Sequence, residues 1–107
     1  MFPYGRPGPG QWAFAVESDG ERVGELWLGE RGDELSRGAL WVFDVRIDEA
    51  HRGRGFGRAA MVEAEREAAR RGHDRVVLNV FAGNGVARRL YESLGYADVA
   101  VIMVKSL

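Results

Sequence analysis

His51-Arg52-Gly53-Arg54-Gly55-Phe56-Gly57-Arg58 is the stretch of this 107-residue sequence that decides the fold. Its glycines lack a Cβ atom, so the backbone can adopt positive φ and approach a ligand closely. An apolar run precedes the stretch and a helical pattern follows it, so we expect a turn between a strand and a helix. Backbone N–H groups and the helix dipole favour an anion at such a turn, and Arg54 and Arg58 can add positive charge to it.

The apolar periodicity on either side of this turn predicts a set of strands and helices. Strand patterns cover residues 11–17, 23–28 and 39–47, and turn chemistry joins the first two. Helical spacing runs from Gly55 to Gly72, and a second helix is expected between Asn84 and Gly95, with Asn84 as its N-cap. Residues 76–81 and 96–104 are the remaining expected strands.

These elements predict an α/β fold: a mixed β-sheet with flanking helices, in the order β-β-β-α-β-α-β. The strand–helix–strand unit of residues 39–81 should be parallel and right-handed, and the opening hairpin extends the sheet on its antiparallel side. Strict alternation puts every second residue of 39–47 on one face, beginning with Ala39, and Leu40, Val42 and Asp44 on the other. We expect residues 1–10, rich in proline and glycine, to be an irregular lead-in, and residues 11–107 to be a single domain.

Charge and composition exclude several classes of function. The net charge is −1, so no global field attracts nucleic acid or an anionic membrane. No apolar run reaches the roughly 18 residues of a membrane span, and residues 1–6 lack a signal-peptide layout, so we expect a cytoplasmic protein. The absence of cysteine excludes disulfides, thiolate metal sites and thiol nucleophiles, and no metal site is expected.

Three kinds of phosphate-binding turn contain glycine-rich segments and can be compared with this one. A P-loop would end in Gly-Lys-Ser/Thr, which is absent. A dinucleotide fingerprint is formally present from Gly55 to Ala60, but it begins about seven residues after the expected strand, and no acidic residue ends the next strand. The third pattern matches: Arg52-x-x-Gly55-x-Gly57 resembles the Gln/Arg-x-x-Gly-x-Gly/Ala signature of GNAT (Gcn5-related) N-acetyltransferases.

A second block, residues 79–96, is also similar to this family. It combines a strand and an asparagine, Asn84, with an alanine three residues on, then Leu90-Tyr91 and Leu94-Gly95-Tyr96. The resemblance covers residues 39–107 specifically and the opening hairpin more loosely. It implies the GNAT acyl-CoA N-acyltransferase fold in an N-terminally shortened form, because the usual first strand and helices have no counterpart here.

The resemblance implies an acetyl-CoA-dependent N-acetyltransferase that transfers acetyl to a primary amine by direct attack. Tyr91 matches the family tyrosine that protonates the departing CoA thiolate, and an N–H near Ile47 would donate to the thioester oxygen. The residues implied in binding acetyl-CoA comprise the end of one strand, the glycine-rich turn and two positions of the second block: Val45, Arg46, Ile47, Arg52, Gly53, Arg54, Gly55, Phe56, Gly57, Arg58, Asn84 and Tyr91.

The identity of the general base, the group that would accept the proton of the amine, stays open. Relatives that acetylate protein N-termini often carry glutamate where this chain has Asn79, and asparagine cannot accept a proton. Asp44, a water chain or an amine that arrives unprotonated are the alternatives, although Asp44 can instead pair with Arg46. The identity of the amine acceptor is equally open.

Two other functions compete with acetyl transfer. In the family, the N-terminal helices form a wall of the acceptor site, so their absence favours a catalytically silent acyl-CoA-binding module or a fragment that needs a partner. The unpaired edge of the first strand favours a homodimer or strand exchange. A nucleic-acid-binding domain could use the Arg/Gly loop, but the near-neutral charge counts against it.

Overall fold

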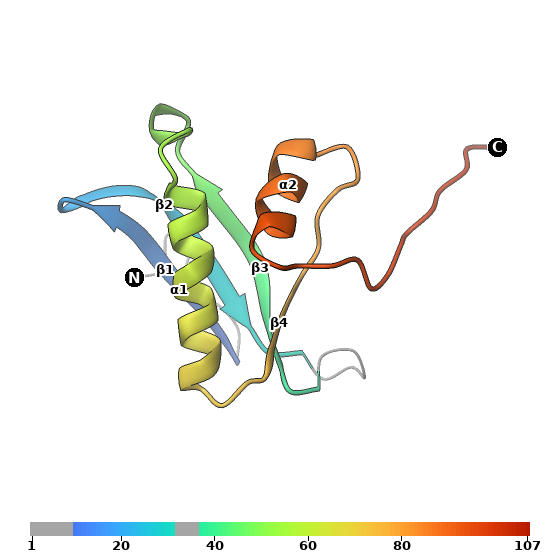
Figure 1. Ribbon diagram of the computed structural model, residues 1–107, viewed down its shortest axis with the longest axis horizontal. Coiled ribbons are helices and arrows are strands. Elements are labelled where there is room, and N and C mark those ends of the chain that lie inside the picture. Colours follow the sequence, from blue (N-terminus) through green and yellow to red (C-terminus); the bar gives the residue numbers. More distant parts are fainter. Residues whose placement is uncertain (1–9, 32–36) are drawn as a thin grey trace.

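A four-stranded mixed sheet in the order β1-β2-β3-β4, with both helices over one of its faces, makes up most of the molecule (Figure 1). The computed structural model describes residues 10–31 and 37–107, so most of the expected lead-in lies outside the described residues. The elements are β1 Gln11–Ser18, β2 Glu21–Gly29, β3 Ala39–Ile47, the 3₁₀ turn η2 Glu49–His51, α1 Phe56–Arg70, β4 Arg75–Leu78 and α2 Gly85–Ser93. Through α2 this is the predicted order, and the α/β fold class is confirmed.

The opening hairpin has the shortest loop that antiparallel strands permit. Ser18 pairs with Glu21, which leaves Asp19 and Gly20 as the two loop residues. Both have positive φ, at 52° and 78°, as a type I′ turn requires. Aspartate is one of the few residue types besides glycine that tolerate this conformation. The pair Asp19-Gly20 therefore accounts for the two-residue turn.

β3 contains a bulge that the alternation pattern did not predict. Trp27 pairs with Asp44, but the next residue of β2, Leu28, pairs with Val42, so Phe43 is an extra residue in β3. The two-residue period is therefore broken, and Val45 joins Leu40 and Val42 in contact with the same core cluster. The expectation that Val45 shares a face with Ala39, opposite Leu40, was wrong for this reason.

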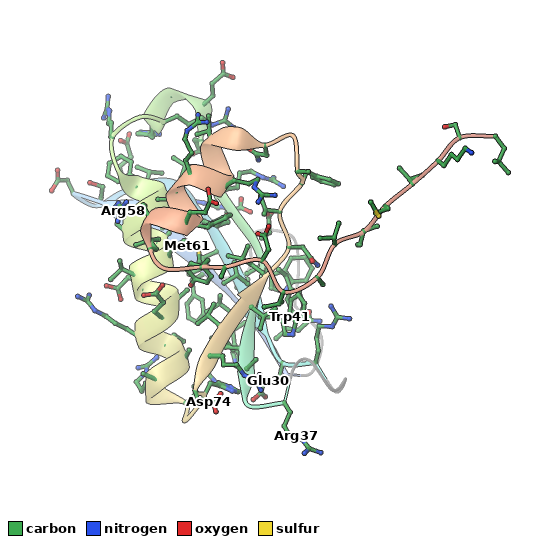
Figure 2. The ribbon with its side chains drawn as sticks, turned by 45° about the vertical axis from the view of Figure 1, so that its right-hand side comes forward. Glu30, Arg37, Trp41, Arg58, Met61 and Asp74 are labelled. Carbon is green, nitrogen blue, oxygen red and sulfur yellow. The ribbon has the colours of Figure 1, made fainter. Side chains whose placement is uncertain are left out.

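α1 packs closely on the sheet because most of its buried face is alanine. Ala60, Ala64 and Ala68 are buried together with Met61, which is fully buried against the sheet (Figure 2). Small side chains let the helix backbone approach, and Met61 fills the remaining space. At the far end of α1 the Arg71 guanidinium carbon lies 3.7 Å from the ring centroid of Trp12, a cation–π contact that joins the helix end to β1.

The parallel crossover is confirmed, but its second strand is shorter than expected. β3 and β4 pair in parallel from Ala39↔Arg75 to Val42↔Leu78. The strand ends at Leu78 rather than at Phe81, and Phe81 is 89% exposed. The chain turns away from β3 after Leu78 (Figure 1), so the later apolar residues have no strand to pair with.

The last expected strand, residues 96–104, is not formed. Residues 97–107 belong to no strand or helix and run away from the rest of the molecule in an extended path (Figure 1). Their apolar side chains are highly exposed, from 75% at Val99 to 94% at Val104. A strand requires a neighbouring strand edge to pair with, and this segment meets none.

Among the described residues, no helix combines the length and apolar character that crossing a membrane requires.

Replacement of Gly24 by alanine should test how closely β2 and β3 approach each other. A Cβ at Gly24 would lie 2.1 Å from the Arg46 carbonyl oxygen, so the strands must separate, at a cost of about 1–3 kcal/mol in unfolding free energy. Gly83→Ala is the matched control, because a Cβ there meets no atom within 4 Å. The denaturant midpoint should fall for Gly24→Ala alone. Equal midpoints for both variants would contradict the described strand spacing.

Candidate functional site

The sheet opens between β3 and β4, at the carboxyl ends of both strands. β4 ends at Leu78, opposite Val42, whereas β3 continues to Ile47. Beyond Val42 the edge of β3 that faces β4 has no strand partner among the described residues. Exposure changes at the same point, because residues 39–42 are buried and residues 43–47 are partly or largely exposed. The gap therefore presents free backbone donors and acceptors to an extended ligand.

The turn after β3 is held to the sheet by two side chains. Arg52 Nε donates a hydrogen bond to the Ile47 carbonyl oxygen at 3.0 Å. His51 Nε2 lies 3.0 Å from Glu21 Oε1, and its ring packs edge-on against Phe56 with centroids 6.3 Å apart. The glycine-rich segment is thereby fixed at the open end of β3. This long-range pairing with Glu21 had no signal in the sequence.

The N-terminus of α1 has the features of an anion site. Gly55 is the N-cap in left-handed conformation, φ 84°, and Gly53 has φ 79°, so both positions require glycine. No side chain caps the helix and no acidic residue lies in its first turn. The first intrahelical bond is from Ala59 N–H to the Gly55 carbonyl, which leaves the N–H groups of residues 56–58 without an intrahelical acceptor.

The third glycine of the turn is in a different environment. Gly57 does not have positive φ, and a Cβ there would lie 3.5 Å from Leu90 Cδ2 and 4.0 Å from Ile47 Cγ1. Gly57 therefore lies where α1, α2 and β3 meet. Both distances are ordinary van der Waals contacts, so neither the backbone conformation nor the packing requires glycine at this position.

Three of the four arginines in the expected site are bonded to other residues of the chain, and the fourth, Arg54, is bonded to no described residue. Arg58 donates to the Ser93 hydroxyl, which joins the first turn of α1 to the end of α2; Figure 2 shows Arg58 on this part of α1 beside α2. Arg52 holds the turn as described, and Arg46 donates to Asp44 at 3.3 Å. Arg54 makes no hydrogen bond or ion pair to another described residue, so its charge is available to a ligand at the turn.

Asn84 caps α2, as predicted. Its side-chain oxygen accepts a hydrogen bond from Ala87 N–H at 3.2 Å. The side chain is exposed, so its amide nitrogen can still donate to a ligand while the oxygen caps the helix. Asn84 follows directly from the segment that leaves β4, and α2 begins one residue later.

Tyr91 is half-buried against the core cluster, with its ring 5.9 Å from that of Tyr96. Burial raises the pKa of its phenol, and the negative charge of Asp44 raises it further. The Tyr91 hydroxyl makes no hydrogen bond to a described residue. It is therefore protonated at neutral pH and free to donate a proton.

Tyr96 and the acidic residues complete the surroundings of Tyr91. The Tyr96 hydroxyl donates to Glu65 Oε2 at 2.9 Å, which ties the end of α2 to the middle of α1. Burial is the main cause of the raised pKa of Tyr96, followed by this hydrogen bond. Asp44 is 41% exposed at its side chain, and Asn79 is exposed.

In the described part of the chain no three His, Cys, Asp or Glu residues gather in a way that could hold a metal ion.

Comparison with known proteins gives one family. The model of the acetyltransferase (GNAT) family matches residues 2–96. YdgE of Bacillus subtilis, an uncharacterized N-acetyltransferase, is 34% identical over 109 residues, a match that spans this whole chain and 68% of YdgE. The mycothiol acetyltransferase of Beutenbergia cavernae is 37% identical over 90 residues, 84% of this chain and 29% of that protein.

Solved structures have the same fold. The Bacillus subtilis YycN structure superposes with a TM-score of 0.80 and 28% identity, over 92% of this chain and 63% of YycN. Aminoglycoside N-acetyltransferase AAC(6′)-Iy, in complex with CoA, superposes with a TM-score of 0.77 at 16% identity, over 94% of this chain and 78% of that one. The chain thus spans about two thirds of the two Bacillus proteins. Sequence and fold agree, and the chain belongs to the acetyltransferase (GNAT) family.

Proposed function

We propose that this chain binds acetyl-CoA and transfers its acetyl group to a primary amine. One observation carries the proposal: the open edge of β3 ends at an uncapped helix N-terminus with an uncommitted arginine, Arg54. An extended arm with amide groups fits the open edge, and a pyrophosphate fits the helix N-terminus. CoA contains both groups, because its pyrophosphate joins the amide-containing pantetheine arm to the adenosine nucleotide.

The proposed contacts follow from this arrangement. The backbone of Val45, Arg46 and Ile47 would pair with the pantetheine arm, and the turn from Gly53 to Arg58 would hold the pyrophosphate. Asn84 would donate to the pantetheine through its amide nitrogen. Arg52 and Arg58 support these contacts indirectly, since their guanidinium groups are bonded to Ile47 and Ser93.

The chemistry requires few side chains. The amine nitrogen attacks the thioester carbon, the carbonyl oxygen takes the electron pair, and an N–H near Ile47 stabilises it. When the C–S bond breaks, Tyr91 gives its proton to the CoA sulfur. The nitrogen loses its extra proton to water or to Asp44. Most of the acceleration comes from positioning of the two reactants, so no covalent enzyme intermediate is needed.

The acceptor is proposed only as a class. A relative in Saccharomyces cerevisiae named N-alpha-acetyltransferase 40 is 37% identical over 76 residues, although the match spans only 26% of that protein. Peptide N-terminal amines are therefore a first choice for screening, with lysine side chains and small amines after them. We propose cytoplasmic action, because the donor is an intracellular metabolite, and a dimeric state, because the outer edge of β1 pairs with no other described strand.

Isothermal titration with acetyl-CoA tests the donor site. The chain should bind with a dissociation constant on the order of micromolar, and Gly55→Glu should abolish binding, because a carboxylate would occupy the anion site. Gly72→Glu is the matched control: Gly72 has the same φ of 84°, also has open space around it, and lies at the opposite end of α1. If both variants lose binding alike, the effect is strain and the proposed site is wrong.

Turnover tests the role of Tyr91. Tyr91→Phe should lower kcat about a hundredfold, the usual contribution of a positioned acid, and should leave acetyl-CoA binding intact. The released CoA thiol can be followed with a thiol reagent, since the chain has no cysteine of its own. Tyr96→Phe is the control: it removes a neighbouring hydroxyl that is bonded to Glu65, and kcat should fall far less than for Tyr91→Phe. Tight binding without turnover on any amine would favour the silent acyl-CoA-binding alternative.

Alkaline pH tests the environment of Tyr91. Because its native pKa is raised, above pH about 10 the unfolded chain ionises before the native chain does. The native state then binds more protons, so stability falls as pH rises through this range. Tyr91→Phe should reduce this fall, as measured by urea unfolding at pH 9 and pH 11 (both roughly one unit from the ordinary tyrosine pKa). An unchanged fall would show that the phenol is solvated.

A further inference from the structure

His51 lies just before the glycine-rich turn and contacts residues on both sides of it. Its Nε2 atom lies 3.0 Å from Oε1 of Glu21, the first residue of β2. Its ring packs edge-on against Phe56, the first residue of α1, with ring centroids 6.3 Å apart. Residues 52–55, which include two of the turn glycines, lie between these two rings in the sequence. The imidazole therefore joins the β1–β2 hairpin to the helix N-terminus across the turn.

The ring nitrogens of His51 show which of its contacts requires a histidine. The side chain is 16% exposed, and Nδ1 is buried without a hydrogen-bond partner among the described residues. A buried polar atom without a partner lowers stability, and a phenylalanine would fill the same place without that loss. Because a carboxylate only accepts hydrogen bonds, Nε2 donates to Glu21. This hydrogen bond is what distinguishes histidine from an apolar ring here.

The end of the hairpin is shaped to reach the turn. The register of β1 and β2 shifts between Val16 and Glu17, which leaves Val23 as an extra residue of β2. A bulge of this kind bends the strand and redirects its side chains. The Val23 carbonyl accepts a hydrogen bond from Asp48 N–H at 2.8 Å. The hairpin thus contacts the chain after β3 twice, through its backbone at Val23 and through the side chain of Glu21.

Few other contacts hold the centre of the turn. Gly53 and Gly55 have positive φ, and glycine also populates other conformations readily. Among the described residues, Gly53 and Arg54 make no hydrogen bond that would fix this shape. Arg52 is bonded to Ile47 on one side of the glycines. The imidazole, in contact with the hairpin and with the first helical residue, is the side chain that spans the turn.

We propose that His51, held by Glu21, is a positioning residue that keeps the glycine-rich turn in its anion-binding shape and so sets the affinity for acetyl-CoA. The inference rests on the donor site of the proposed function. Without the clamp, the turn has to be ordered when the ligand binds, and this cost weakens binding. The hairpin thereby contributes to donor affinity without supplying a group that binds the donor.

A double-mutant cycle with acetyl-CoA titration tests the clamp. His51→Phe keeps a ring against Phe56 but cannot donate, and Glu21→Ala removes the acceptor. Each should raise the dissociation constant about tenfold, and the double variant should raise it no further, because both changes remove the same bond. Glu21→Gln keeps an acceptor oxygen and should bind like the wild type. Unchanged binding in both single variants, or losses that add in the double variant, overturns the proposal.

His73 supplies the matched control at the other end of α1. Its side chain is 11% exposed, and its Nε2 lies 3.0 Å from Oε2 of Glu30, just after β2, without hydrogen-bond geometry. His73→Phe should leave the dissociation constant unchanged. In turnover, His51→Phe should raise the KM for acetyl-CoA and leave kcat unchanged. A fall in kcat, or equal weakening by His73→Phe, would show a general loss of structure and overturn the positioning role.

Backbone relaxation measured by NMR on the free chain separates this inference from the proposed function. The order parameters of the Gly53 and Gly55 amides should fall from roughly 0.85 toward 0.6 in His51→Phe and in Glu21→Ala, but not in His73→Phe. If they fall and the wild-type chain binds no acetyl-CoA, the clamp is supported and the proposed donor site is wrong. Equal order parameters in all variants overturn the clamp, whatever the chain binds.

Discussion

The separation of β3 from β4 after four paired residues on each strand is the constraint on which the rest of the site depends. In a parallel pair the two strands would normally continue together, and their backbone groups would be satisfied by each other. Here β3 runs on to Ile47 while β4 stops at Leu78. The backbone polar groups along the open edge can bond only to water or to a ligand. The proposed binding edge is thus made of backbone groups and needs no dedicated side chain.

Two side-chain hydrogen bonds join α1 to α2 and to the residues that follow it. Arg58 is bonded to Ser93 at the end of α2, and Tyr96, just beyond α2, is bonded to Glu65. The first lies at the start of α1 and the second at its middle. Both helices also contact the same core cluster. The opening is therefore fixed by packing that lies behind it, which favours a preformed site over one assembled on binding.

The sequence predicted most of the fold but not its irregularities. The bounds of β3, the start of α1 after Gly55 and the Asn84 cap of α2 could be predicted, because periodicity and cap chemistry are local. The bulge at Phe43 could not, since it depends on the register with β2. The end of β4 and the path of residues 97–107 depend on which neighbours are present, which a pattern of apolar residues does not specify. In the site, local motifs identified the turn, but the long-range pairs of His51 and Arg58 had no signal.

The position of Tyr91 on the core does not compete with its proposed role in catalysis. A proton donor must be protonated while the attacking amine is neutral, and amines become neutral only as pH rises. Burial raises the pKa of Tyr91, and so does the charge of Asp44, so the two conditions overlap over a wider range of pH than they would for a solvated phenol. The contacts that make Tyr91 a core residue also orient its ring. One physical cause, partial burial, thus gives the residue its place in the fold and its protonated state.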